Sequence, residues 1–327
     1  MGPAAPSRDA PYHRGMDPLY LVLEVSATAF FIGAAIVALR RGRLPFLELA
    51  SAATFGLLLE EGDQLIFETY HYAPEFVMSI DRAPLVIGLT WALIMAGAMR
   101  ITDALGVRRR YAPAVDSILA ISLDLAFDAV AIRMGLWTWR DVGLTNAWFG
   151  VPAGNFYAWL FVTAGFSFMS RWLRARTLQR PALEWLQLAV PLPAFAILIA
   201  ALVPFTMLVP IVDPTPGGGM ILFVIAFAAF GAVAAYGVWG PDRGRPDGAT
   251  RAILDLRLAF ASRIAIHGFF LGALLVMGLA TRLPIIAAVA VALLAAELQL
   301  AWLVRSRQTD LDAAPAAQPE RRQPALP

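Results

Sequence analysis

The sequence predicts an all-α fold, a polytopic integral membrane bundle of helices. Hydrophobic residues form 59% of the 327-residue chain and charged residues 15%, with a mean hydropathy of +0.66. Soluble globular domains contain fewer apolar residues, about 45–50%. The apolar residues gather in long runs, and arginines occupy alternate segments between those runs. Run length, composition and charge placement together indicate a membrane protein.

Each apolar run is long enough to cross about 30 Å of hydrocarbon as a helix. The runs lie near residues 20–39, 45–67, 84–106, 112–136, 153–172, 184–211, 219–239, 256–280 and 283–304. They predict about nine spans. The first run follows Pro18, and no clear small-residue cleavage site comes after it, so we expect a retained helix rather than a signal peptide. The second run begins near Pro45 and the fourth near Ala112, and both carry acidic residues.

The chain is expected to form one transmembrane domain, residues 18–305. Residues 1–17 form a polar N-terminal segment, and residues 306–327 are rich in Ala and Pro, which predicts a disordered tail. We find no convincing internal repeat, which weakens the interpretation as a transporter built from inverted repeats.

All 26 basic residues are arginines, and most lie between alternate runs. The clustered arginines are Arg40, Arg41, Arg43, Arg108, Arg109, Arg110, Arg171, Arg174, Arg176, Arg180, Arg243, Arg245, Arg251, Arg305 and Arg307. The positive-inside rule places these segments in the cytoplasm, the N-terminus outside and the C-terminus inside. The opposite segments hold only Arg82, Arg140 and Arg282. The pI near 9.2 therefore reflects topology, and no basic stripe indicates a nucleic-acid partner.

Missing residue types exclude several chemistries. Without lysine, no Schiff base to retinal or pyridoxal can form. Without cysteine, there is no thiolate metal site, iron–sulfur cluster or disulfide. His13, His71 and His267 are too few for a histidine-rich di-iron centre, and the glycines at 217–219 lie between two spans, where they indicate a loop turn rather than a dinucleotide fingerprint. We therefore expect neither metal nor cofactor, and an enzyme that works with side chains and water.

Acidic residues inside the apolar runs are the main functional signal. Asp124 and Asp128 are four residues apart and share one helical face. A carboxylate in a membrane helix costs roughly 2.5 kcal/mol or more, so such a residue is a functional hypothesis by default. At 1.5 Å per residue, Glu60 and Asp128 reach similar heights in the outer half of the bilayer and could face one pocket. Alternatively, each acid caps a neighbouring helix or pairs with Arg133.

Tryptophans surround the outer ends of the fourth and fifth runs, at Trp137, Trp139, Trp148 and Trp159. Each alone is typical of an interfacial aromatic belt. The cluster also encloses the turn at residues 150–155, whose Asn155 amide can enter the membrane from its outer edge, and such a break is tolerated where it lines a cavity. These residues favour a pocket.

Arg263 and His267 lie four apart on the eighth run, and Glu297 lies midway along the ninth. Two interpretations remain open. The residues form a buried ion pair, or Arg263 extends its side chain to the cytoplasmic surface.

Residues 50–165 resemble the membrane carotenoid biosynthesis protein family, which includes carotenoid 1,2-hydratases and bisanhydrobacterioruberin hydratases. The resemblance rests on motif residues whose spacing is kept: Tyr70, His71, Tyr72, Pro84, Trp91, Asp116, Asp124, Asp128, Trp137, Trp139, Phe149, Gly150, Pro152, Gly154, Asn155 and Trp159. The chain departs from the family pattern at Glu68, where the family has glycine, and in a shortened stretch before it. Because of that departure, the sequence leaves open whether Glu60 or Glu61 matches the family glutamate.

The resemblance implies a hydratase that adds water to the terminal double bond of an acyclic (ψ) carotenoid end group, giving a tertiary alcohol. This reaction needs a proton donor, a site for a tertiary cation and a positioned water. Burial favours the neutral form of one carboxyl, while a neighbouring carboxylate stabilises positive charge. Aromatic faces add roughly 0.5–2 kcal/mol of cation–π stabilisation.

We expect Asp124 and Asp128 to supply the acid and the counter-charge, and Glu60 or Glu61 to activate water. The expected lining of the substrate pocket comprises Tyr70, Tyr72, Trp91, Trp137, Trp139, Asn155 and Trp159, with Asn155 holding the water. The expected partners are a carotenoid, membrane lipids and other carotenoid pathway enzymes, in a bacterial or archaeal cytoplasmic membrane. A proton-coupled carrier of a lipid-like solute and a non-catalytic scaffold are the alternatives.

Overall fold

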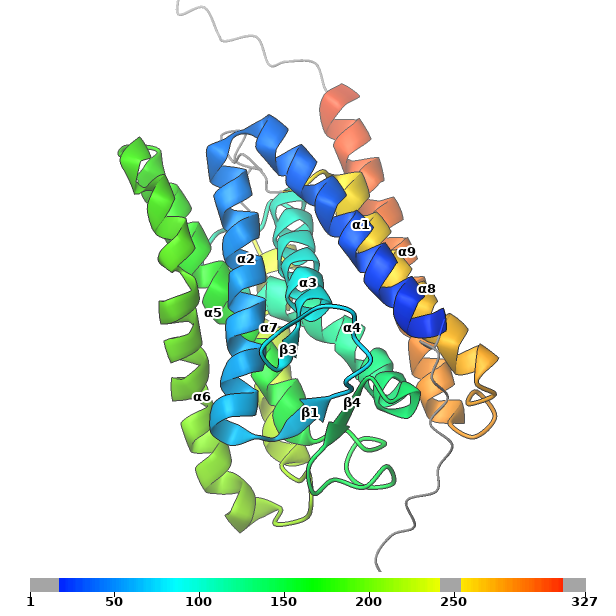
Figure 1. Ribbon diagram of the computed structural model, residues 1–327. Coiled ribbons are helices and arrows are strands. Elements are labelled where there is room, and N and C mark those ends of the chain that lie inside the picture. The colour runs from blue at the N-terminus through cyan, green and yellow to red at the C-terminus, as the bar shows by residue number, and fades with distance from the viewer. Residues whose placement is uncertain (1–17, 242–253, 314–327) are drawn as a thin grey trace, which may run out of the picture.

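Nine α-helices follow one another in the described part of the chain, residues 18–241 and 254–313 of a computed structural model (Figure 1). They are α1 (Pro18–Arg41), α2 (Arg43–Gly62), α3 (Leu85–Ala104), α4 (Ala112–Met134), α5 (Ala153–Thr177), α6 (Pro191–Val212), α7 (Met220–Trp239), α8 (Leu256–Val276) and α9 (Pro284–Ala313). A π-helical turn, Asp63–Phe67, continues α2, and a 3₁₀ helix, Pro181–Ala189, precedes α6. The all-α class predicted from the sequence is confirmed.

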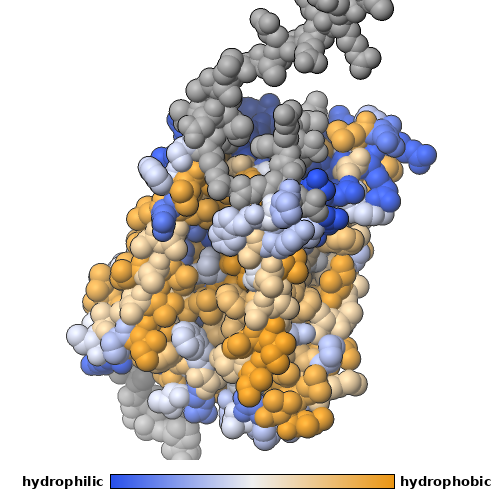
Figure 2. All heavy atoms as spheres, turned by 180° about the vertical axis from the view of Figure 1, so that it is seen from behind, coloured by the Kyte–Doolittle hydropathy of each residue, from blue (hydrophilic) through white to orange (hydrophobic). Residues whose placement is uncertain are grey.

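Six helices, α1, α3, α6, α7, α8 and α9, have the length and hydropathy needed to span a membrane. One face of the molecule is apolar over most of its length, with hydrophilic side chains gathered toward the two ends (Figure 2). α2, α4 and α5 are 20, 23 and 25 residues long and pack within the same bundle, but they carry more polar and ionisable residues. The protein is thus a helical membrane protein, and the count of nine spans stays a prediction.

The structure changes two details of the sequence-based boundaries. The run at 184–211 is not one helix, because the 3₁₀ helix ends at Ala189 and α6 begins at Pro191. Proline at the first helical position lacks the backbone N–H that would continue a preceding helix, so it starts a new one. α9 extends to Ala313, past the boundary drawn at residue 305. The segment 1–17 and the remainder of the predicted tail, 314–327, lie outside the described residues.

The predicted orientation relies on arginines that lie outside the helices. In the structure, not all of the arginines used for that prediction do so. Arg171 and Arg174 do not lie in a loop, as the sequence suggested, but within α5, where both are buried. Arg243, Arg245 and Arg251 lie outside the described residues. Arg108, Arg109, Arg110, Arg176 and Arg180 remain between or at the ends of helices.

The orientation has a direct test. Reporter domains fused after Arg110 and after Arg180 are expected to score as cytoplasmic, because positively charged segments are retained on that side. Fusions between α2 and α3 serve as the control and are expected to score as external. External scores at both arginine positions would reverse the orientation.

α2 and α3 pack in close backbone contact through two glycines. A Cβ at Gly56 would lie 2.6 Å from Cβ of Trp91, and a Cβ at Gly88 would lie 2.4 Å from Cγ of Leu57. Real side-chain atoms do not approach this closely, so neither position accepts a side chain without moving a helix. The close contact places the last turn of α2, with Glu60, beside Trp91 of α3.

Two short strands close one end of the bundle. β1 (Tyr70–Tyr72) pairs antiparallel with β4 (Trp137–Trp139), Tyr70 opposite Trp139 and Tyr72 opposite Trp137. Directly opposed residues in an antiparallel pair point to the same face, and residues two apart share it, so all four aromatic rings lie on one side. A second pair, β2 (Ser79–Ile80) and β3 (Ala83–Pro84), forms the hairpin before α3.

A buried ion-pair network ties α2, α3, α4 and α5 together at the opposite end. Arg174 donates to both carboxylate oxygens of Glu48, at 2.7 and 2.8 Å, and to Asp103 at 3.2 Å. Arg171 donates to Asp103 and, at 3.1 Å, to Asp116. Buried charges are retained when paired and hydrogen bonded, so this network holds the helices in register.

A second buried ion pair joins α8 and α9. Arg263 donates to both oxygens of Glu297 at 2.8 Å, and its side chain is fully buried. The same guanidinium donates to the carbonyl oxygen of Leu119 on α4 at 2.8 Å. Of the two interpretations drawn from the sequence, the buried ion pair is confirmed.

Candidate functional site

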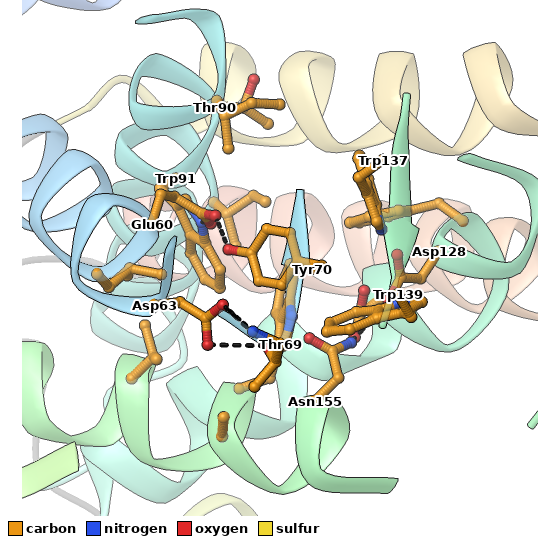
Figure 3. A pocket seen from close by; sticks show the side chains of 18 of the residues that line it. Glu60, Asp63, Thr69, Tyr70, Thr90, Trp91, Asp128, Trp137, Trp139 and Asn155 are labelled. Atoms are coloured by element: carbon orange, nitrogen blue, oxygen red, sulfur yellow. Dashed lines mark hydrogen bonds between the residues drawn. The ribbon is translucent and has the colours of Figure 1, made fainter. Parts of the chain in front are cut away.

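A cavity of about 560 Å³ lies inside the bundle beneath the β1–β4 sheet (Figure 3). Ten of the eleven site residues predicted from the sequence line it: Glu60, Tyr70, Tyr72, Trp91, Asp124, Asp128, Trp137, Trp139, Asn155 and Trp159. They come from α2, β1, α3, α4, β4 and α5, segments spread over a hundred residues of chain. The structure therefore brings together groups that the sequence only suggested were at similar heights.

Glu60 is surrounded by hydrogen-bond donors. The hydroxyls of Tyr70 and Tyr72 both donate to its Oε2, the latter at 2.6 Å, and the Trp91 indole N–H donates to Oε1 at 2.6 Å. Burial, together with the negative charge of Glu60, raises the pKa of both tyrosine phenols well above the usual value, so they remain protonated donors. Three donors around one carboxyl are arranged to stabilise the Glu60 carboxylate as an anion.

Asp124 and Asp128 share a single amide donor. Nδ2 of Asn155 lies 2.8 Å from Oδ2 of Asp124 and 2.7 Å from Oδ2 of Asp128. The Oδ1 atom of each aspartate is buried and has no hydrogen-bond partner among the described residues. Both amide hydrogens of Asn155 are thus used, and its Oδ1 is left to accept a hydrogen bond from a bound molecule.

No arginine in the described part of the chain forms an ion pair with these three acids. Among the salt bridges of the described residues, none involves Glu60, Asp124 or Asp128. Arg133 donates instead to main-chain oxygens, those of Ala129 in its own helix and of Leu144 and Phe149 in the turn before α5. The alternative in which Arg133 pairs with the acids has no support in this geometry.

The turn before α5 positions Asn155. Gly150 has φ of +90°, and a Cβ there would lie 2.9 Å from the Ile132 side chain, so the position requires glycine. The Trp148 indole N–H donates to the Leu125 carbonyl at 2.9 Å and attaches the turn to α4. As a result α5 begins deep enough for Asn155, in its first turn, to reach the carboxyls.

Aromatic rings enclose the acids. The Trp91 and Trp159 ring centroids are 4.2 Å apart, and those of Tyr70 and Trp139 are 4.9 Å apart. Trp139 Nε1 is buried and has no hydrogen-bond partner among the described residues. Figure 3 shows Trp137 beside Asp128 and Trp139 above Asn155. Ring faces of this kind stabilise a cation held between them.

Glu61 is the predicted site residue that the structure keeps away from the cavity. Successive helical residues point about 100° apart, and Glu61 faces the β2–β3 hairpin while Glu60 faces the pocket. Its carboxylate accepts the backbone N–H of Ala83 at 3.0 Å and that of Arg82 at 3.3 Å. Glu61 anchors the hairpin that leads into α3.

Polar residues that were not predicted from the sequence lie at the mouth of the cavity. Asp63 accepts a 2.8 Å hydrogen bond from the Thr69 hydroxyl, and Arg140 donates to Glu68 at 2.7 Å. The hydrogen bond and charge of Arg140 lower the pKa of Glu68, which keeps that carboxylate ionised. Asp63 comes three residues after Glu60, the helical spacing that could have identified it. In residues 18–241 and 254–313, no group of three or more His, Asp or Glu side chains is arranged to hold a metal ion.

Comparison with known proteins identifies a family. Residues 16–224 match the carotenoid biosynthesis protein family, a segment that contains every cavity residue contributed by α1 to α6 and by both strands of the β1–β4 sheet. No curated protein and no solved structure matches the chain. The match spans well over half of the sequence and confirms the resemblance seen in the tyrosine, aspartate and tryptophan motifs. This chain belongs to the carotenoid biosynthesis protein family.

Proposed function

We propose that this protein is a carotenoid hydratase that adds water to the terminal double bond of an acyclic end group and forms a tertiary alcohol. The observation that carries the proposal is the arrangement of three buried carboxyls in one aromatic cavity. Asp124 and Asp128 share the Asn155 donor, whereas Glu60 accepts three donors of its own. The pocket thus offers a proton source and a fixed negative charge.

The aspartate pair is suited to carry the proton. Two carboxylates that share one donor in a water-poor site repel each other, so the pair retains a proton. That proton passes to the less substituted alkene carbon, the π electrons form the new C–H bond, and the more substituted carbon becomes a tertiary cation. Glu60 and the indole faces of Trp91 and Trp159 stabilise the positive charge. Glu60 takes this role rather than the activation of water expected from the sequence, because its oxygens already accept three hydrogen bonds.

The cycle closes with water. A water molecule bound to Oδ1 of Asn155 attacks the cation and forms the C–O bond. The protonated alcohol that results then gives one proton to the aspartate pair, which regenerates the acid. One water is added and nothing is oxidised or reduced, which suits a pocket built from carboxyl, amide and aromatic side chains.

The oxygen source tests the proposal. Purified protein in detergent, given an acyclic carotenoid and ¹⁸O-labelled water, is expected to give an alcohol carrying the label. The rate is expected to be the same under nitrogen and with a chelator present, because the reaction needs neither oxygen nor metal. Label that comes from O₂ would identify a hydroxylase and overturn the hydratase proposal.

The same assay separates the two alternatives. A proton-coupled carrier or a pathway scaffold would leave the carotenoid chemically unchanged, whereas a hydratase turns it over without a partner protein. The proposal also includes residence in a bacterial or archaeal cytoplasmic membrane and association with other carotenoid pathway enzymes.

A further inference from the structure

The cavity extends from the acids toward two sides of the bundle. One side is lined by α1 and α8, through Ser26, Ala27, Phe30, Ala265, Ile266 and Phe269. The other is lined by α6, through Phe195, Ile199, Leu202 and Phe205. Figure 1 shows α6 at one edge of the bundle and α1 and α8 at the opposite edge. The acids therefore lie between two apolar arms of the cavity.

The α6 side is tightly packed against its neighbours. A Cβ at Gly62 of α2 would lie 2.9 Å from the Phe195 ring, and a Cβ at Gly154 of α5 would lie 3.2 Å from the Phe205 ring. Large α6 side chains thus occupy positions where α2 and α5 have only glycine. On this side, α6 therefore packs directly against the backbones of α2 and α5.

The α1 and α8 side is packed loosely. A Cβ at Gly33 of α1 or at Gly272 of α8 would meet nothing within 4 Å. Gly33 lies seven residues after Ser26, and Gly272 seven residues after Ala265, so each shares a helical face with a residue that lines the cavity. The residues that face the cavity here include three with small side chains, Ser26, Ala27 and Ala265. α1 and α8 contact each other at fewer positions than α6 contacts α5 or α2.

α1 is anchored on either side of its cavity-lining segment. Toward its N-terminal end, Glu24 accepts the backbone N–H of Val77 at 2.9 Å. At its C-terminal end, Arg41 donates to the Leu254 carbonyl at 2.5 Å and to Asp255 at 3.2 Å. Ser26, Ala27 and Phe30 lie between these two anchors, so α1 is held in place where it lines the cavity.

We infer that the space between α1 and α8 is a lateral opening through which the apolar chain of the substrate enters the cavity from the lipid. The inference depends on the proposed function for its occupant, a long polyene. Val22 and Val25 on α1 are 52% and 59% exposed, so lipid chains reach the border of the opening. A polyene can then pass from lipid to pocket without crossing water.

A row of aromatic rings leads inward from this opening. Ring centroids are 5.0 Å apart between Phe269 and Phe270, 4.8 Å between Phe270 and Phe127, and 5.6 Å between Phe127 and Trp159. Trp159 is next to Trp91, which binds Glu60. The row offers a continuous apolar surface that guides an end group to the acids.

The absence of cysteine from the sequence allows a reversible test. Ala27→Cys and Ala265→Cys are each modified with a bulky methanethiosulfonate reagent, and the attached group is later removed with a reductant. The probe is lycopene, whose binding is followed by quenching of tryptophan fluorescence. Modification is expected to slow binding and turnover about tenfold or more, and reductant is expected to restore both. Restoration shows that the variant had remained folded.

Matched controls use the same reagent. Ile36 on α1 is 45% exposed and lies outside the cavity lining. Modification of Ile36→Cys is therefore expected to change neither the rate of lycopene binding nor the rate of turnover. Ile199→Cys tests the α6 side. The proposed opening would be overturned if modification at both Ala27→Cys and Ala265→Cys left the rate of lycopene binding unchanged. It would also be overturned if only modification at Ile199→Cys slowed binding.

Binding and turnover separate this inference from the proposed function. If the unmodified protein binds lycopene without hydrating it, the hydratase proposal fails, and the effect of modification on binding rate still decides the opening. If the unmodified protein does not bind lycopene, the lateral opening for a polyene is overturned.

Discussion

Asp124→Asn and Asp128→Asn are each expected to lower turnover about 100-fold or more, the usual contribution of a general acid, while the protein remains folded. The amide keeps the size and polarity of the carboxyl but cannot donate the proton. Because Asn155 is hydrogen bonded to both aspartates, either substitution also alters the proton-sharing pair. Specific activity and melting temperature are measured on the same preparations.

Asp116→Asn is the matched control on the same helix. Asp116 binds Arg171 and Ser167 in the ion-pair network and does not line the cavity. Its neutralisation is expected to lower the melting temperature while the folded molecules keep normal turnover. Near-normal turnover in both Asp124→Asn and Asp128→Asn would remove this pair from the mechanism and leave Glu60 as the acid to be tested.

Arg174→Ala is expected to produce the largest loss of stability, about 3–5 kcal/mol, because it leaves a buried carboxylate without its partner. Arg174 is bound to Glu48, which is fully buried, through two hydrogen bonds, and also to Asp103. The midpoint of thermal unfolding in detergent measures the effect. The residual folded protein is expected to hydrate its substrate normally, since the network does not line the cavity.

A double variant serves as the control for charge. Glu48→Met combined with Arg174→Met removes both charges and fills similar volume, so it is expected to recover much of the lost stability. If Arg174→Ala unfolds at the temperature of the unmodified protein, the network does not hold the helices together.

Most of the helices could be predicted from the sequence because membrane spans need long apolar runs. Eight of the nine predicted runs correspond to one helix each, though α2 continues into its π turn. The pocket acids were also predictable, since a carboxyl in such a run is costly. The strands were missed, although Tyr70 and Tyr72, and likewise Trp137 and Trp139, alternate with the period of a strand. Three-residue strands are too short for periodicity to identify.

Partners across the bundle were not predictable. Arg171 and Arg174 looked like loop charges because they follow an apolar run, yet they are paired with Asp103 and Glu48 on other helices. Pairing depends on which helix faces meet, and one sequence does not contain that information. The choice of Glu60 over Glu61 was unresolved for the same reason.

The contact between Gly56 and Gly88 has a consequence for the strength of the acid site. The backbone separation of α2 and α3 determines whether the Trp91 indole can reach Glu60 at 2.6 Å. A single methyl group at Gly56 would push Trp91 away, and the carboxylate would lose one of its three donors without any change in the cavity's residue types. The electrostatic field that the substrate experiences is therefore adjustable from outside the pocket, by the volume of two residues that never contact the substrate.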